Sequence, residues 1–201
     1  WAHLDIAGPG FNGGGAWVTS PDTSFVNNAT FSGNEAGQSA ALLASSSATV
    51  NLNNSTITGQ TSTTPGGGAV ATNTASADLS LRNVVVWENT GGNGSAEAGS
   101  TMKIEFAVMD GACPAGVTCG SVSSDDPLLG TLGLHGGAVA TFPIPASSPA
   151  VDAASNLFCS DEDARNGPRP FDGDGIGGAE CDIGAYEYIS PPTLNIDDVE
   201  G

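Results

Sequence analysis

Apolar and polar residues alternate in short runs along the first half of the chain. Val50 and Leu52 flank one polar residue, and Leu79 and Leu81 flank another. This period of two is typical of a β-strand with one buried face. No segment carries the 3.6-residue spacing and the caps of an amphipathic helix. The pattern therefore predicts an all-β fold.

Three segments repeat the same pattern. They are TSFVNNATFSGN at 23–34, TVNLNNSTITGQ at 49–60 and DLSLRNVVVWEN at 78–89. Asn28, Asn54 and Asn83 correspond, with spacings of 26 and 29 residues. Strands this short cannot bury a face alone, whereas stacked coils can. We expect a parallel β-helix in which these asparagines form a ladder between coils. A β-sandwich is the alternative, but its strands have no reason to repeat the same asparagine.

The repeats divide the chain into four expected parts. These are about four β-helix coils in 1–111, an irregular connection in 112–150, an acidic cap in 151–190 and a tail or linker in 191–201. Because the end of a solenoid exposes unpaired strand edges, we expect the acidic part to cover one end of the stack.

The four cysteines fall into two pairs that are close in sequence. Cys113 stands near Cys119, and Cys159 precedes Cys181. Neither spacing is that of a zinc site. We expect two local disulfides, which form in an oxidising compartment outside the cytoplasm. Four free thiols in a cytosolic protein are the alternative.

The charge balance limits the partners. The chain has 22 acidic and 4 basic residues, with a formal net charge of −18. This charge disfavours nucleic acid and anionic membrane surfaces as partners, because both bind through clustered Lys and Arg. The sequence has no apolar run long enough to cross a bilayer and no signal peptide. Since it opens at Trp1 without a Met, we expect a piece of a longer secreted precursor.

Two motifs in the second half carry a family resemblance. They are SSPAVDAA at 147–154 and CDIGAYE at 181–187. With the upstream repeats, they resemble the bacterial choice-of-anchor Q domain. The resemblance implies a right-handed parallel β-helix that is secreted or displayed on a bacterial surface. It brings no set of catalytic residues.

The acidic part holds the candidate metal ligands. They are Asp161, Asp163, Asp172, Asp174 and Asp182. The Asp-x-Asp-Gly run at 172–175 resembles the start of a calcium loop, in which alternate carboxylates bind one hard cation. Ile176 and Ile183 stand where a full EF-hand loop has further ligands. Ca²⁺ is therefore the candidate cofactor, and a glycine-rich turn whose aspartates bond backbone amides is the alternative.

Two further groups of residues have expected roles. Trp87 follows Val86 in the strand alternation, so we expect it on an exposed face as the best candidate binding residue. Arg165 and Arg169 lie among the acidic residues. We expect them to form exposed ion pairs that contribute little to stability.

Catalysis has weak support in the sequence. A polysaccharide lyase would use Arg82 or Lys103 as its base, but no acidic cluster repeats beside them. A glycoside hydrolase would need paired carboxylates, and Asp125 and Asp126 lie outside the repeats. His135 has no partner that the sequence identifies. We therefore expect a non-catalytic structural or adhesive protein whose partners are other copies, other surface proteins or a polysaccharide. A carbohydrate-active enzyme or a glycan-binding module is the alternative.

Overall fold

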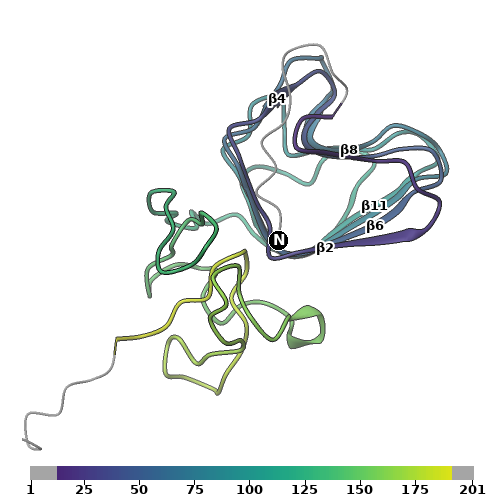
Figure 1. The fold of residues 1–201 in the computed structure, drawn as a ribbon. Helices are drawn as coiled ribbons and strands as arrows, with labels where there is room; N and C mark the ends of the chain where they lie inside the picture. The colour runs from purple at the N-terminus through teal and green to yellow at the C-terminus, as the bar shows by residue number, and fades with distance from the viewer. Residues whose placement is uncertain (1–12, 192–201) are drawn as a thin grey trace, which may run out of the picture.

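Figure 1 shows the computed structural model of the chain, viewed along a stack of coils. The structure describes residues 13–191, so Trp1 and residues 192–201 of the expected tail lie outside the described residues. Within this range the fold is all-β, without an α-helix and with one 3-10 turn, η1, at Asn156–Phe158. The expected parallel β-helix of about four coils is confirmed.

Each coil contributes strands to the same positions of the stack. The strands are β1 (Ala16–Val18), β2 (Thr23–Asn27), β3 (Thr30–Ser32) and β4 (Glu35–Ala36) in the first coil, β5 (Ser39–Ala44), β6 (Thr49–Thr58) and β7 (Thr61–Ser62) in the second, β8 (Gly68–Thr72) and β9 (Asp78–Trp87) in the third, and β10 (Gly94–Ser95) and β11 (Thr101–Met109) in the fourth. All pairs between these strands are parallel, and they form sheets β1-β5-β8-β10, β2-β6-β9-β11 with β3 on β6, and β4-β7.

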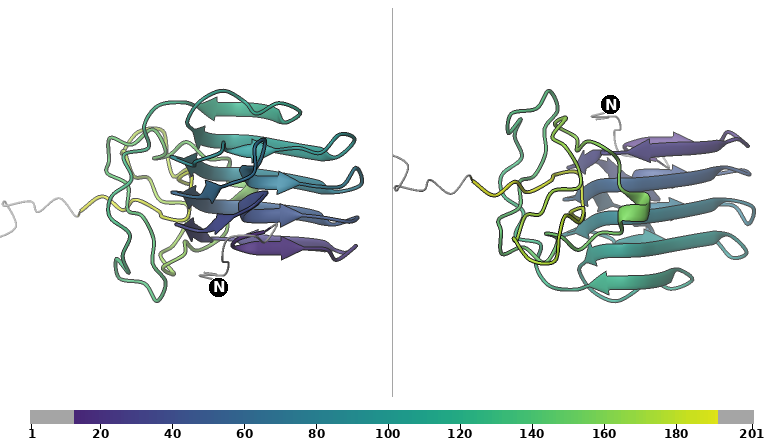
Figure 2. Two further views of the ribbon diagram at one scale, coloured as in Figure 1. Left: turned by 90° about the horizontal axis from the view of Figure 1, so that it is seen from above. Right: turned by 90° about the horizontal axis from the view of Figure 1, so that it is seen from below.

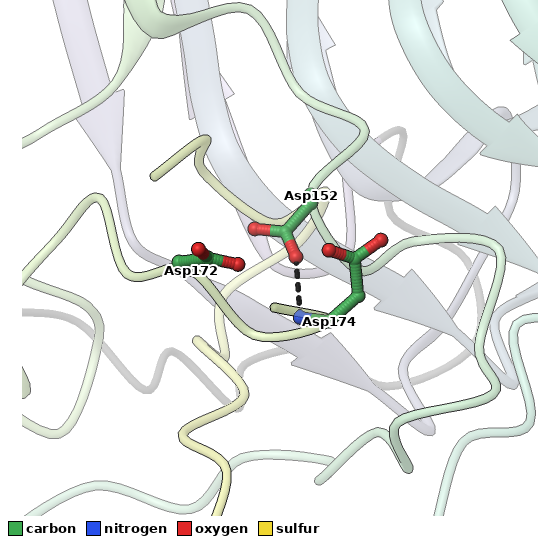
Figure 3. Close-up of side chains that lie close together, drawn as sticks. All are labelled: Asp152, Asp172 and Asp174. Atoms are coloured by element: carbon green, nitrogen blue, oxygen red, sulfur yellow. Dashed lines mark hydrogen bonds between the residues drawn. The ribbon is translucent and has the colours of Figure 1, made fainter. Parts of the chain in front are cut away.

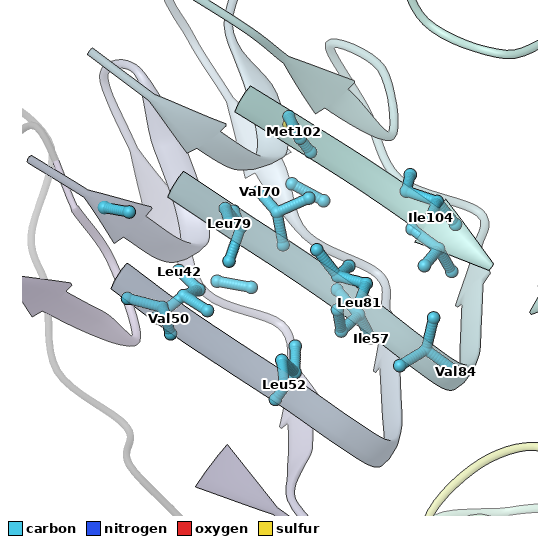
Figure 4. Close-up of a cluster of buried hydrophobic side chains, with 14 of the residues drawn as sticks. Leu42, Val50, Leu52, Ile57, Val70, Leu79, Leu81, Val84, Met102 and Ile104 are labelled. Atoms are coloured by element: carbon cyan, nitrogen blue, oxygen red, sulfur yellow. The ribbon is translucent and has the colours of Figure 1, made fainter. Parts of the chain in front are cut away.

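The inside of the stack is filled by aliphatic ladders (Figure 4). Leu52, Leu81 and Ile104 occupy the same register position in successive coils and are fully buried. Val50 and Leu79 form a parallel ladder two residues earlier. Close packing of like side chains across coils is what makes the short strands stable, because no single coil has a core of its own.

A left-handed residue bends the large sheet at the same place in every coil. Asn28, Asn54 and Asn83 have φ of 55°, 48° and 54°. Phe106 and Ser121 continue the position with φ of 52° each, although neither is an asparagine. Asparagine tolerates this region of φ better than other non-glycine residues because its short side chain bonds locally. The bend turns the chain onto a further face of the stack.

The repeat extends further than the sequence predicts. Residues 112–150 were expected to be irregular throughout, but β12 (Thr118–Ser123) pairs in parallel with β11 and begins a fifth turn. Its register positions hold Cys119 and Gly120, opposite Ile104 and Glu105. Because these side chains are small, β12 lacks the alternation of large apolar and polar residues that predicts the other strands.

The acidic part lies along the side of the stack rather than over its end. Figure 2 shows this C-terminal region beside all of the coils. We call residues 144–188 the lateral segment. Its Ile144, Ala150 and Ile183 pack on outward-facing Val85 and Val108, in a second buried cluster outside the coil interior. The expectation of an end cap is corrected, because the segment covers an apolar outer face.

The asparagine ladder holds the lateral segment in place. Asn83 Nδ2 donates to Ser155 O at 3.0 Å and Asn83 Oδ1 accepts from Ser155 N at 2.9 Å. Asn54 Nδ2 donates to Phe158 O, and Asn28 Nδ2 donates to Glu162 O, both at 2.8 Å. The expected coil-to-coil bond is present from Asn83 Nδ2 to Asn54 Oδ1, at 3.1 Å.

The two motifs that carry the family resemblance meet in this segment. Ile183 N donates to Ala150 O at 2.8 Å, and Ala154 N donates to Cys181 O at 2.9 Å. Gly184 has φ of 112°, and a Cβ there would lie 3.0 Å from Thr56 Oγ1. A glycine is therefore required where this motif crosses the second coil.

We predict that Asn83→Ala lowers the free energy of unfolding by about 3 kcal/mol. The substitution leaves the backbone N–H and C=O of Ser155 without their hydrogen-bond partner. It also puts alanine in the left-handed region of φ. Urea unfolding measures the loss. Asn83→Gly should lose less, because glycine tolerates the backbone angle. Asn53→Ala, which removes a bond between two outer amides, is the matched control. An equal loss in Asn53→Ala and Asn83→Ala contradicts the role of the ladder.

Candidate functional site

Three carboxylates of the lateral segment form an acidic cluster (Figure 3). Asp152, Asp172 and Asp174 each place a carboxylate oxygen within 4.8 Å of the others. Asp152 Oδ2 accepts from Asp174 N at 2.8 Å, and Asp172 Oδ1 accepts from Gly175 N at 2.7 Å. Oxygen ligands of this kind suit a hard cation. The same carboxylates also accept hydrogen bonds from backbone amides of the glycine-rich turn, as the alternative interpretation expects.

The cluster contains only part of the predicted metal site. Asp172 and Asp174 come together as expected, whereas Asp161 is exposed elsewhere and Asp163 and Asp182 are buried in another network. Asp152 was missed, because it lies 20 residues before Asp172. Its presence in the same motif as the buried Ala150 is the signal that could have pointed to it.

Two arginines and three carboxylates form a buried ion network. Arg165 Nη2 lies 2.7 Å from Asp163 Oδ2, and Arg169 Nε lies 3.0 Å from Glu187 Oε2. Asp182 is fully buried beside them. The expectation of exposed, weak ion pairs is therefore wrong for Arg169, because the lateral segment closes over it. Removing one partner of a buried pair costs far more than removing one partner of an exposed pair.

The pKa values in this network follow from burial. Burial raises the pKa of Asp182 to about 7, and the nearby Glu187 carboxylate adds to the rise. Backbone N–H groups of Tyr188 and Asp152, and then Arg169, act in the opposite direction. Burial also raises the pKa of Glu187, against the opposing charge of Arg169. Burial lowers the pKa of Arg169, and three carboxylates oppose that shift.

Arg169 is incompletely satisfied. Its Nη2 donates to Gly184 O at 2.8 Å, but Nη1 has no hydrogen-bond partner. Nε is close to Glu187 without the alignment of a hydrogen bond. A buried donor without an acceptor costs free energy. The pairing of Arg169 with Glu187 therefore acts through charge rather than through a well-aligned hydrogen bond.

A groove with a volume of about 500 Å³ lies at the end of β9. Its lining residues are Thr58, Trp87, Glu88, Asp126, Leu128, Leu129, Gly130 and Phe142. Trp87 points away from the coil interior as expected, but it is half-buried rather than exposed, since it packs against the second buried cluster. Trp87 forms part of a concave site that the acidic residues Glu88 and Asp126 also line.

The residues considered for catalysis have other contacts. Arg82 Nε donates to Glu105 Oε2 at 3.2 Å, and its guanidinium lies 4.6 Å from the ring centre of Phe158. His135 Nε2 lies 2.8 Å from Thr131 O. Lys103 is exposed on β11. Arg82, Lys103 and His135 lie outside the groove at Trp87, whereas Asp126, which was considered for a hydrolase, lines it.

Both expected disulfides are present, Cys113–Cys119 and Cys159–Cys181. The second joins the two halves of the lateral segment, which explains how the motifs at 147–154 and 181–187 are kept together. The alternative of four free thiols is wrong. Disulfide-bonded proteins occur in oxidising compartments, so the pairs fit an extracellular protein.

Among the described residues, none belongs to a helix of the length and apolar character that a membrane crossing requires.

Comparisons of the chain with protein-family models, with curated proteins and with solved structures found no match. The resemblance to the choice-of-anchor Q domain therefore remains a prediction that depends on its motifs.

We predict that Asp182 makes the protein less stable as the pH rises. Its pKa in the folded state, about 7, exceeds its ordinary value of 3.8. The folded state therefore holds more protons than the unfolded state between these values, and stability falls as they are lost. The slope is at most about 1.4 kcal/mol per pH unit for one proton.

Urea unfolding at pH 5, 6, 7 and 8 measures this slope. Asp182→Asn should flatten the decline, whereas Asp161→Asn, an exposed control, should keep it. If the stability of Asp182→Asn declines with pH as steeply as that of the wild-type protein, a group other than Asp182 releases the proton.

Proposed function

We propose that this chain is a non-catalytic extracellular adhesive protein that binds carbohydrate in the groove at Trp87. The observation that carries the proposal is the composition of the groove. A half-buried tryptophan lines one concave site together with two acidic residues, Glu88 and Asp126. Aromatic walls with a few polar groups are typical of small-molecule sites.

The residues of the groove match the two kinds of surface on a sugar ring. The electron-rich face of Trp87 attracts the weakly positive C–H groups on one side of the ring. The carboxylates of Glu88 and Asp126 accept hydrogen bonds from its hydroxyl groups, and charged acceptors make these bonds stronger. The net charge of −18 repels anionic polymers, so the proposal specifies a neutral glycan.

The proposed location is the surface of a bacterial cell. Two disulfides support an oxidising compartment. The resemblance to the choice-of-anchor Q domain supports display on a bacterial surface. Other copies and other surface proteins are further partners in this proposal, because the last strand of a β-helix has a backbone edge that another chain can extend.

Glycoside hydrolysis is the second candidate function. The observation that favours it is that Glu88 and Asp126 line the same groove, and a pair of carboxylates is what most glycoside hydrolases use. Binding without cleavage is preferred here, because the family that the chain resembles brings no set of catalytic residues.

The proposed cofactor is Ca²⁺, bound by the acidic cluster of Asp152, Asp172 and Asp174. Carboxylate oxygens from two parts of the lateral segment would then bind one ion and join those parts. In this proposal the ion stabilises the lateral segment and takes no part in binding carbohydrate.

We predict that Trp87→Ala weakens binding of a neutral oligosaccharide about tenfold, because the stacking surface is lost. Glu88→Gln should weaken binding without affecting the packing of the indole. Calorimetry with glucose-, mannose-, galactose- and xylose-based oligosaccharides measures both effects. Trp17→Ala removes an aromatic ring that is 57% exposed and lies outside the groove, so it is the matched control.

Size-exclusion chromatography of the same oligosaccharides after incubation separates binding from cleavage. Intact products support the adhesive function. Shortened products that disappear in Glu88→Gln would replace it with glycoside hydrolysis, and binding unchanged in both groove variants would exclude the groove.

We predict that Ca²⁺ in excess raises the melting temperature by about 3 °C, because it binds only the folded lateral segment. A chelator should reverse the rise. Asp174→Asn should abolish it, and Asp161→Asn, which removes an acidic side chain outside the cluster, should not. A rise of equal size in Asp174→Asn would show that Ca²⁺ acts elsewhere on this acidic protein.

A further inference from the structure

A second hollow lies on the other side of the asparagine ladder. It has a volume of about 250 Å³ and is bounded by the start of the large sheet and by residues 157–160 of the lateral segment. We call Phe25, Asn27, Asn53 and Leu157, which line it, the Phe25 shelf. The shelf shares no lining residue with the groove at Trp87.

The shelf exposes apolar side chains that the fold does not use. The side chain of Phe25 is 68% exposed, although its strand neighbour Val26 packs against the core. Leu157 is 82% exposed on the opposite wall. Single exposed apolar residues are common, but two that face one hollow indicate a contact surface.

The amides of the shelf have unused hydrogen-bonding capacity. Asn53 Nδ2 donates to Asn27 Oδ1 at 3.0 Å. This bond leaves Asn27 Nδ2 as a donor that has no acceptor among the described residues. Asn53 Oδ1 is buried and has no hydrogen-bond partner. Asn53 Oδ1 is too deeply buried to accept from a ligand, so Asn27 Nδ2, on an exposed residue, is the amide group that a ligand hydroxyl can bond.

The wall of the shelf is held rigidly. Phe158 O accepts from Asn54 Nδ2 at 2.8 Å, and Ser160 Oγ donates to Asn28 Oδ1 at 2.9 Å. Cys159, which stands between Phe158 and Ser160 in the sequence, is fixed by its disulfide to Cys181. Since the wall is fixed before a ligand arrives, binding does not have to order a loop.

We propose that the Phe25 shelf is a second carbohydrate subsite, which takes one ring of a neutral glycan. The ring stacks on Phe25, and one of its hydroxyls accepts a hydrogen bond from Asn27 Nδ2. The inference goes beyond the groove at Trp87, because the shelf would bind without it.

The test uses Trp87→Ala protein, in which binding by the groove is weakened, and soluble neutral glucan, mannan, galactan and xylan as probes. Affinity electrophoresis should show that this protein still binds one of the polymers. Adding Phe25→Ala should weaken that binding about tenfold, whereas adding the control Trp17→Ala should leave it unchanged. The NMR signals of the Asn27 and Asn53 side-chain amides should shift on binding.

Three results would overturn the proposal. The first is a loss of all binding in Trp87→Ala alone, which leaves the groove as the site and removes the shelf. The second is equal binding by the Phe25→Ala and Trp17→Ala proteins. The third is a change of sedimentation in Phe25→Ala without a change in glycan binding, which would make the shelf a contact between copies. If the wild-type protein binds none of the probes, both carbohydrate sites are overturned.

Discussion

The left-handed backbone at Asn28, Asn54 and Asn83 is the constraint on which the rest of the molecule depends. Together with Phe106 at the same position of the fourth coil, it bends the coils at one place and so creates the outer face that Val85 and Val108 occupy. The asparagine side chains then bond the chain that covers this face. One residue type therefore fixes both the cross-section of the stack and the position of the lateral segment.

This arrangement places the two candidate carbohydrate sites on opposite sides of the bend. The Phe25 shelf lies before it, and the groove at Trp87 lies after it. In both sites a coil supplies the aromatic ring and a later part of the chain supplies the opposite wall. The solenoid alone would present flat sheets, so the hollows exist only because further chain packs against it.

The β-helix could be predicted from the sequence because its signal is local and repeated. The strands around Asn54 and Asn83 show alternating aliphatic residues at a constant offset. β12 escaped prediction because cysteine and glycine occupy its register positions. Asp152 and the burial of Arg169 escaped it because they depend on contacts between distant segments, which no spacing encodes.

The bonds between the ladder and the lateral segment change how the stack can come apart. A solenoid normally has only nearest-neighbour contacts, so its coils can fray one at a time from an end. Here the bond from Asn83 to Ser155 spans 72 residues, and the bond from Asn28 to Glu162 spans 134. Hydrogen bonds of this sequence separation connect the first and third coils to the same lateral segment. These coils therefore unfold together, and the stack opens cooperatively. They also raise the contact order, which slows folding.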